Sequence, residues 1–192
     1  MRKKIIKLTT IGAVSVLILF YIAGIIFPPS ISERRINEAL AFCKKNNLNT
    51  DYAIFVDFGK HSGRERYMIY NFSKHKVVYR CLCATGLNKD KFSNIPGSNL
   101  SSLGKYRITN GIITMSIGRE GLVVDGLERS NSNARKRRIL IHHSDILDLS
   151  PKSLFPIPII GKGISHGCFS ITSEGIRRTR ELPKPVLLWA YK

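Results

Sequence analysis

Apolar residues form one long stretch near the front of this chain, followed by many short runs with the period of β-strands. Nearly every position from 8 to 27 is apolar, and four basic residues precede the stretch. Twenty helical residues span about 30 Å, the thickness of a bilayer core, and Pro28-Pro29 would end such a helix. The pattern predicts a membrane anchor over residues 1–29. A cleaved signal peptide is the alternative, but large apolar residues at the end of the stretch disfavour cleavage.

The charges flanking this stretch predict its orientation. Basic residues without any acid before the apolar segment favour a cytoplasmic N-terminus. The expected protein is therefore a single-pass protein of the cytoplasmic membrane. Everything after residue 30 would face the periplasm or cell wall.

The remaining pattern predicts a short helix and linker over residues 30–51 and one domain over residues 52–192. Helical spacing occurs at 32–46 and again at 173–182. Strand-like runs are short and numerous: 52–58, 66–72, 77–84, 105–109, 111–117, 121–125, 139–142 and 186–191. Residues 145–164 are too rich in proline and glycine to form one regular element. We expect a mainly β fold with mixed or antiparallel sheets and two or three short helices.

The composition limits the partners of this domain. With 31 Lys and Arg against 13 Asp and Glu, the chain carries a formal net charge of +18. Nucleic acid is not expected as a partner, because the domain is predicted to be exported and has no recognisable nucleic-acid-binding motif. An anionic lipid or wall polymer fits the charge, as does an ordinary solvated basic surface. Nothing in the pattern predicts the oligomeric state.

Cysteine usage excludes a disulfide scaffold and a zinc site. The four cysteines are few for an exported domain, and no CxxC spacing occurs. Cys81 and Cys83 lie two apart in a strand, so they share a face and would not readily pair with each other. We expect Cys43, Cys81 and Cys83 to be buried apolar residues, with a disulfide from Cys43 to the 66–84 hairpin as the alternative.

The fourth cysteine has unusual neighbours, in the sequence Ser165-His166-Gly167-Cys168. A thiol needs a base to become a nucleophile at neutral pH, and glycine lets a reacting carbonyl approach the backbone. The amides of Gly167 and Cys168 in a tight turn could stabilise an oxyanion. Twenty-six positions upstream of the cysteine, His142 ends the apolar run 139–142. The order of histidine and cysteine predicts a cysteine acyl-transfer enzyme.

Which histidine acts as the base is open from the pattern alone. His142 and His143 are adjacent at a strand end, so one faces inward and the other outward. His166 precedes the cysteine by two positions and is expected to orient the thiol or face the substrate. No metal ligand set is visible among these residues.

These features together resemble the L,D-transpeptidase catalytic domain (YkuD-like), and within it the murein L,D-transpeptidase catalytic domain family. The hallmark is a histidine upstream of a Ser/Thr-His-Gly-Cys segment. The resemblance covers residues 52–191. It is carried in order by Asp57-Phe58, Pro96-Gly97-Ser98, Ser101-Ser102-Leu103-Gly104, Asp125-Gly126-Leu127-Glu128, Asn133-Ala134-Arg135, Ile141-His142 and Gly167-Cys168.

The resemblance implies roles for individual residues. Cys168 would be the nucleophile and His142 the base, with the amides of Gly167 and Cys168 as the oxyanion hole. Ser165 and His166 would line the site. The chain departs from the family where His143 replaces a common glycine, and where Ser170 replaces a common Asn or Arg. His143 therefore stays an alternative base.

The implied reaction is peptidoglycan cross-linking without a metal or organic cofactor. Cys168 would form a thioester with a tetrapeptide stem, release D-alanine and transfer the acyl group to a second stem in a 3→3 link. Water as acceptor would give an L,D-carboxypeptidase, and a protein amine would give an attachment enzyme. A sortase-like transpeptidase and an inactive wall-binding domain are further alternatives.

Overall fold

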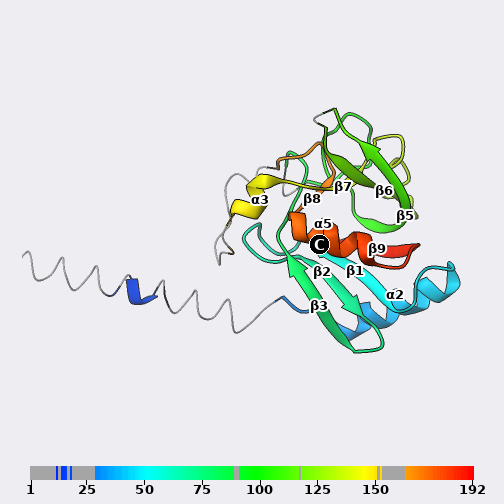
Figure 1. The fold of residues 1–192 in the computed structure, drawn as a ribbon, viewed down its shortest axis with the longest axis horizontal. Helices are drawn as coiled ribbons and strands as arrows, with labels where there is room; N and C mark the ends of the chain where they lie inside the picture. Colours follow the sequence, from blue (N-terminus) through cyan, green and yellow to red (C-terminus); the bar gives the residue numbers. More distant parts are fainter. Residues whose placement is uncertain are drawn as a thin grey trace, which may run out of the picture. The chain divides into compact units, whose positions relative to one another are not determined.

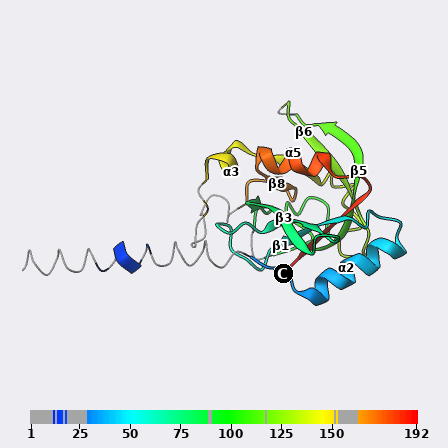
Figure 2. The same ribbon diagram turned by 60° about the horizontal axis from the view of Figure 1, so that its bottom comes forward.

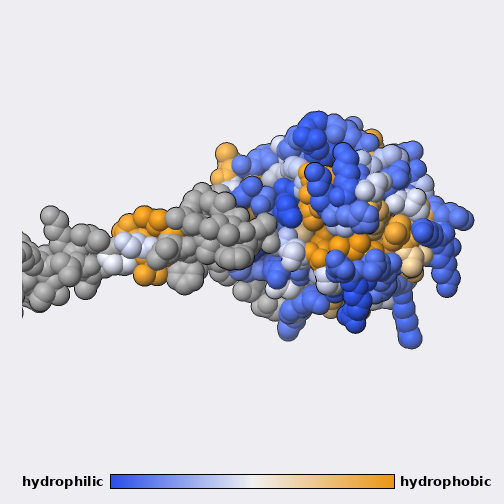
Figure 3. All heavy atoms as spheres, turned by 90° about the horizontal axis from the view of Figure 1, so that it is seen from below, coloured by the Kyte–Doolittle hydropathy of each residue, from blue (hydrophilic) through white to orange (hydrophobic). Residues whose placement is uncertain are grey.

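The computed structural model describes residues 12, 14–16, 18, 29–88, 91–116, 118–150, 152 and 163–192. The chain divides into two compact units, Met1–Ser30 and Ile31–Lys192. The fold below is that of the second unit. Figure 3 shows hydrophilic side chains over most of one face of this unit, with apolar ones gathered near its middle.

Nine strands of the described residues form one mixed sheet in the order β3-β2-β1-β9-β5-β6-β7-β8-β4 (Figure 1). The pairs β1–β9 and β7–β8 are parallel, and the other neighbours are antiparallel. The strands are β1 (Tyr52–Asp57), β2 (Tyr67–Asn71), β3 (Lys76–Cys81), β4 (Cys83–Ala84), β5 (Gly104–Thr114), β6 (Glu120–Gly126), β7 (Leu140–His143), β8 (Phe169–Ile171) and β9 (Val186–Tyr191).

The sheet is buried on both faces because its central strands alternate apolar side chains between two cores. Along β1, Ala53 and Phe55 pack in one core with helix α2 (Glu33–Lys45), while Ile54 and Val56 pack in the other. That second core includes Ile176 of helix α5 (Ser173–Glu181). The two helices accordingly lie on opposite sides of the strands (Figure 2). The mainly β fold with few short helices is confirmed.

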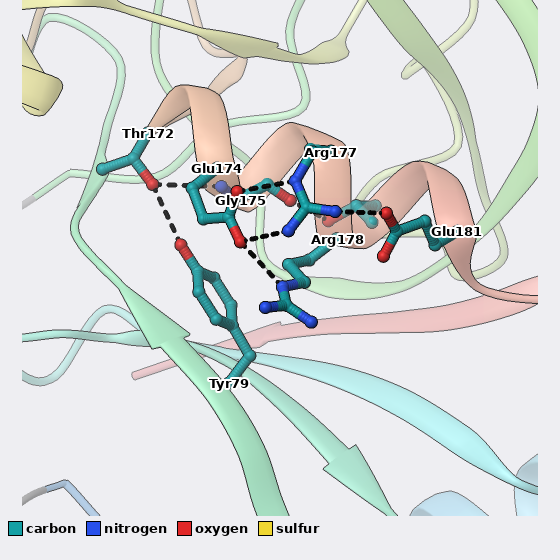
Figure 4. Close-up of polar contacts among 8 residues, drawn as sticks. Tyr79, Thr172, Glu174, Gly175, Arg177, Arg178 and Glu181 are labelled. Carbon is teal, nitrogen blue, oxygen red and sulfur yellow. Dashed lines mark hydrogen bonds and ion pairs between the residues drawn. The ribbon is translucent and has the colours of Figure 1, made fainter.

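Both helices begin where their sequences predict. The Ser32 side chain accepts a hydrogen bond from the Arg35 amide, and the Thr172 side chain accepts one from the Gly175 amide. These N-caps satisfy amides that have no partner inside the helix. Figure 4 shows the outer side of α5, where Arg177 bridges two glutamates of the same helix. Such exposed pairs contribute little stability, so α5 is held by its apolar face.

Several elements differ from those expected. The run 77–84 is expected as one strand, but it forms β3 and the separate β4, which lie at opposite ends of the sheet order. The runs 105–109 and 111–117 were expected as separate strands, but β5 is continuous through Gly111 with a register shift between Ile108 and Ile112. A β-bulge absorbs the extra residues, so the local turn signal does not break the strand. Helix α3 (Asp145–Leu149) lies inside a segment expected to be irregular. The rest of the Pro-rich stretch, 151 and 153–162, lies outside the described residues.

The expected N-terminal transmembrane helix requires a correction. Most of residues 8–27 lies outside the described residues. Among all described residues, no helix is long and apolar enough to cross a membrane. A spanning helix needs about 20 consecutive apolar residues, whereas the longest helix described, α2, has 13 residues and is amphipathic. The structure therefore does not support the expected transmembrane helix.

The other three cysteines are structural. Cys43, Cys81 and Cys83 are buried and free, which confirms the expectation of apolar cysteines and excludes the alternative disulfide in this structure. Cys43, a residue of α2, packs in one core, and Cys81 and Cys83 pack in the other. Burial raises the pKa of each thiol to about 12, so these thiols stay protonated at neutral pH.

Candidate active site

The cysteine and the first histidine come from neighbouring parallel strands. In the β7–β8 pair, His142 is opposite Ser170, and Ile141 is opposite Phe169. Because Ile141 and Phe169 point into one core, the alternation of side chains puts His142 and Ser170 on the other face of this pair. Cys168 directly precedes β8. The parallel pairing thus brings together residues that are 26 positions apart in sequence.

The Cys168 thiol contacts the main chain where β7 begins. The Leu140 amide donates to Sγ at 3.4 Å, and Sγ lies 3.6 Å from the Arg138 carbonyl oxygen. Burial raises the pKa of the Cys168 thiol, while the Leu140 hydrogen bond and the positive charge of Arg137 lower it. Cys168 is partly exposed, unlike the other cysteines. It is the thiol that a reagent or substrate can reach.

His142 is held in the tautomer that a general base requires. Its Nδ1 lies 2.9 Å from the His143 carbonyl oxygen, which can only accept, so Nδ1 carries the proton. Nε2 therefore keeps its lone pair and accepts from the Ser170 hydroxyl at 3.1 Å. Burial lowers the pKa of His142 below its ordinary value, although the bond to the His143 carbonyl acts in the opposite direction. The imidazole is neutral at pH 7.

His143 has different neighbours. It is opposite Ile171 in the β7–β8 register, so its side chain leaves the strand on the face opposite to His142. Its Nε2 lies 3.5 Å from Asp145 Oδ1, at the start of α3. The structure thus brings His142, and not His143, to the face that carries Ser170.

The segment before β8, residues 165–168, forms a tight turn that we call the cysteine turn. The Ser165 hydroxyl donates to the Cys168 carbonyl at 2.9 Å and accepts from the Gly167 amide at 3.3 Å. Gly167 has φ +109, and a Cβ there would lie 2.7 Å from the Leu100 carbonyl oxygen. Glycine is required here for both reasons. Because the Gly167 amide is already paired with Ser165, it is not directed at the thiol in this structure.

His166 is exposed and lies apart from the thiol contacts described above. It lines a pocket of about 260 Å³ together with Leu87, Gly163, Ile164 and Ser165. Ser165 thus connects this pocket to the cysteine turn. Among the described residues, no group of three or more His, Cys, Asp or Glu side chains could hold a metal ion.

Sequence reasoning singled out neither Ser170 as the partner of His142 nor Arg137 beside the thiol. In the sequence, Ser170 is notable only because it replaces an Asn or Arg that is common at this position in the family. Arg137 stands in a basic run, 135–138, that reads as a solvated loop. Its position shortly before β7 is the one sequence feature that points to the site. Only the tertiary contacts distinguish Arg137 from the other basic residues of the run.

A family model matches nearly all of the second unit and identifies the family of this chain. Residues 29–191 match the model described as the L,D-transpeptidase catalytic domain. The chain belongs to this family. The resemblance read from the sequence is confirmed, and it extends upstream to include α2. This match supports a catalytic domain of the L,D-transpeptidase type.

Two of the solved structures that match this chain are L,D-transpeptidases. The chain is 8% identical to the L,D-transpeptidase of Mycobacterium smegmatis, with a TM-score of 0.43, covering 74% of this chain and 59% of that one. It is 12% identical to the Xylanimonas cellulosilytica L,D-transpeptidase, with a TM-score of 0.38, covering 73% and 60%. It is 15% identical to Pgp2 of Campylobacter jejuni, a helical cell shape determining protein, with a TM-score of 0.46, and the match covers 80% of this chain and 53% of that one. The chain thus spans less than two thirds of each. No curated protein matches it.

Proposed function

We propose that this domain is a cysteine-dependent peptidoglycan L,D-transpeptidase with Cys168 as nucleophile and His142 as general base. The observation that carries the proposal is the His142 ring. The ring is neutral, its Nδ1 proton is bound to a carbonyl, and its Nε2 carries the lone pair. His142 belongs to β7, which pairs with β8, the strand that directly follows Cys168. A base in that state can accept the thiol proton.

In the first step, the proton of Cys168 passes to His142 Nε2 as Sγ attacks a stem-peptide carbonyl. The attacked carbonyl is that of the L-centre of the diamino acid, at position three of a tetrapeptide stem. The Ser170 hydroxyl gives up its hydrogen bond to Nε2 during this transfer. The amide bond to the terminal D-alanine then breaks, and the imidazolium returns the proton to the leaving amine. The product is an acyl-thioester on Cys168.

The developing oxyanion needs donors near the thiol. The Cys168 amide is the principal donor in this proposal. The Gly167 amide contributes only if it exchanges its hydrogen bond with Ser165 for the oxyanion. Ser165 would hold the cysteine turn in shape through its bond to the Cys168 carbonyl. His166 would contact substrate from the neighbouring pocket.

In the second step, an amine of another stem attacks the thioester. His142 removes a proton from that amine and passes it to the departing Sγ, which leaves as the thiol, and a 3→3 cross-link is formed. Because peptidoglycan lies outside the cytoplasmic membrane, we propose that the domain acts there. His143, paired with Asp145 on the other face, takes no part in either step.

Incubation with purified disaccharide-tetrapeptide and mass analysis of the products tests this function. Loss of D-alanine with formation of a cross-linked dimer is expected. Tripeptide alone would make water the acceptor and the protein an L,D-carboxypeptidase, which contradicts transpeptidation. Unchanged substrate contradicts both activities. Cys168→Ala is the control, since any product that survives this change does not come from the proposed nucleophile.

A further inference from the structure

Arg137 binds three residues of the 93–102 loop beside the cysteine turn. Its Nη1 donates to the Ser93 carbonyl at 2.7 Å and lies 3.5 Å from the Ser102 hydroxyl. Its Nη2 donates to the Leu100 carbonyl. The guanidinium is only partly exposed. A single side chain from the segment before β7 therefore holds the 93–102 loop.

The same guanidinium packs directly against the cysteine turn. A Cβ added at Gly167 would lie 2.9 Å from Arg137 Nη2 and 2.7 Å from the Leu100 carbonyl oxygen that Nη2 binds. The glycine before the nucleophile thus leaves room for Arg137. The charge approaches the backbone on the N-terminal side of Cys168.

The positive charge of Arg137 has no carboxylate partner among the described residues. Its acceptors are two carbonyls and a hydroxyl, all neutral. Its neighbour Arg135 instead pairs with Asp125 at 2.6 Å. Of the ionisable groups, Arg137 interacts electrostatically with the Tyr106 hydroxyl and with the Cys168 thiol. An unneutralised, half-buried cation stabilises negative charge nearby more strongly than a solvated one does.

We propose that Arg137 is a positioning residue that stabilises the Cys168 thiolate by its charge while it holds the 93–102 loop against the cysteine turn. The proposal rests on Cys168 being the nucleophile of the proposed function. The charge of Arg137 also opposes the rise in the pKa of the Cys168 thiol that burial causes, an effect that the neutral His142 does not oppose by charge. The charge of Arg137 favours the thiolate that forms as the proton passes to His142.

The ionisable groups around Arg137 and the cysteine turn come from three elements. Arg137 belongs to the loop before β7, His142 to β7 itself, and Tyr106, which interacts with Arg137, to β5. Burial raises the pKa of Tyr106 to about 12, so its hydroxyl is neutral across the working range. His142 is neutral at pH 7 and above. In that range Arg137 is therefore the charge that acts on Cys168.

Alkylation of Cys168 by iodoacetamide as a function of pH tests the proposal without any peptidoglycan. The rate is followed by mass analysis of the Cys168 peptide, because only the thiolate reacts. Arg137→Met is expected to move the pH midpoint of alkylation upward and to slow alkylation at pH 7 about tenfold. Arg135→Met, which removes an exposed arginine, is the matched control and leaves the midpoint unchanged.

Two further variants separate charge from structure. Arg137→Lys keeps the charge but cannot reach all three acceptors, so it should keep a near wild-type midpoint while lowering the thermal unfolding temperature. Arg137→Gln keeps two donors without the charge and should shift the midpoint like Arg137→Met, and it replaces that variant if the latter does not fold. A folded Arg137→Met or Arg137→Gln with an unchanged midpoint overturns the proposal. An Arg137→Lys variant whose alkylation midpoint moves as far as those of the neutral variants also overturns the proposal. Because no stem peptide is present, these outcomes do not depend on transpeptidase activity.

Discussion

Cys168 and Cys81 are the same residue type in two very different settings. Cys81 is buried in the core at the end of β3, and burial raises the pKa of its thiol to about 12. Burial acts on Cys168 in the same direction, but there the Leu140 amide and Arg137 oppose it. Cys81 belongs to a strand, whereas Cys168 precedes one and is partly exposed. The strand end thus gives Cys168 a main-chain donor, a nearby cation and access, which the proposed role as nucleophile requires.

The comparison predicts its largest effect for removal of the thiol. Cys168→Ala should lower the rate of D-alanine release about 10⁴-fold or more, because no other group near the site can form the thioester. Cys43→Ala, at a fully buried cysteine, is the matched control and should retain activity while costing about 1 kcal/mol of unfolding free energy. Release assays and chemical denaturation measure the two effects. Normal turnover by the Cys168 variant would remove the cysteine mechanism.

The second effect concerns the two adjacent histidines. His142→Ala should slow D-alanine release about 10²–10⁴-fold, the usual contribution of a general base. His143→Ala should change the rate less than about fivefold, because its side chain pairs with Asp145 on the other face. Steady-state kinetics of both variants provides the measurement. A larger loss in the His143 variant would reverse the base assignment.

The pH dependence of kcat/KM sharpens the comparison further. His142 acts as a base only when neutral, and burial lowers its pKa below the ordinary value. Activity should therefore persist below pH 6.5 and then fall about tenfold for each further pH unit as His142 is protonated. A pH–rate profile from acid to neutral pH gives the midpoint. An acid limb above pH 6.5 would contradict the neutral, desolvated imidazole.

The smallest effect is expected at Ser170. Ser170→Ala removes the hydroxyl that donates to His142 Nε2. Because this bond breaks before Nε2 accepts the thiol proton, the change should alter kcat by no more than about fivefold, the equivalent of one neutral hydrogen bond. Ser173→Ala, at an exposed position of α5, is a control of the same chemistry and should leave kcat unchanged. A loss as large as that of His142→Ala would instead make the hydroxyl an obligatory proton carrier.

Local sequence signals predicted the elements well where packing agrees with them. The serine before Glu33 begins α2, and the apolar run from Val186 to Tyr191 forms β9. The bulge in β5 could not be predicted, because Thr109-Asn110-Gly111 resembles a turn until β6 pairs on both sides of it. The apolar stretch over residues 8–27 met the length rule for a spanning helix, but no described helix fulfils it.

The sequence alone determined the candidate nucleophile, the two candidate bases, the mainly β pattern and the family. These depend on residue type, on short spacing and on alternation, all of which are local. Only the tertiary structure decided that His142 shares a face with Ser170, and that Arg137 rather than Arg135 lies beside the cysteine turn. The reason is physical: strand pairing and loop packing join residues far apart in the chain, and a shift of one position would turn each side chain to the opposite face.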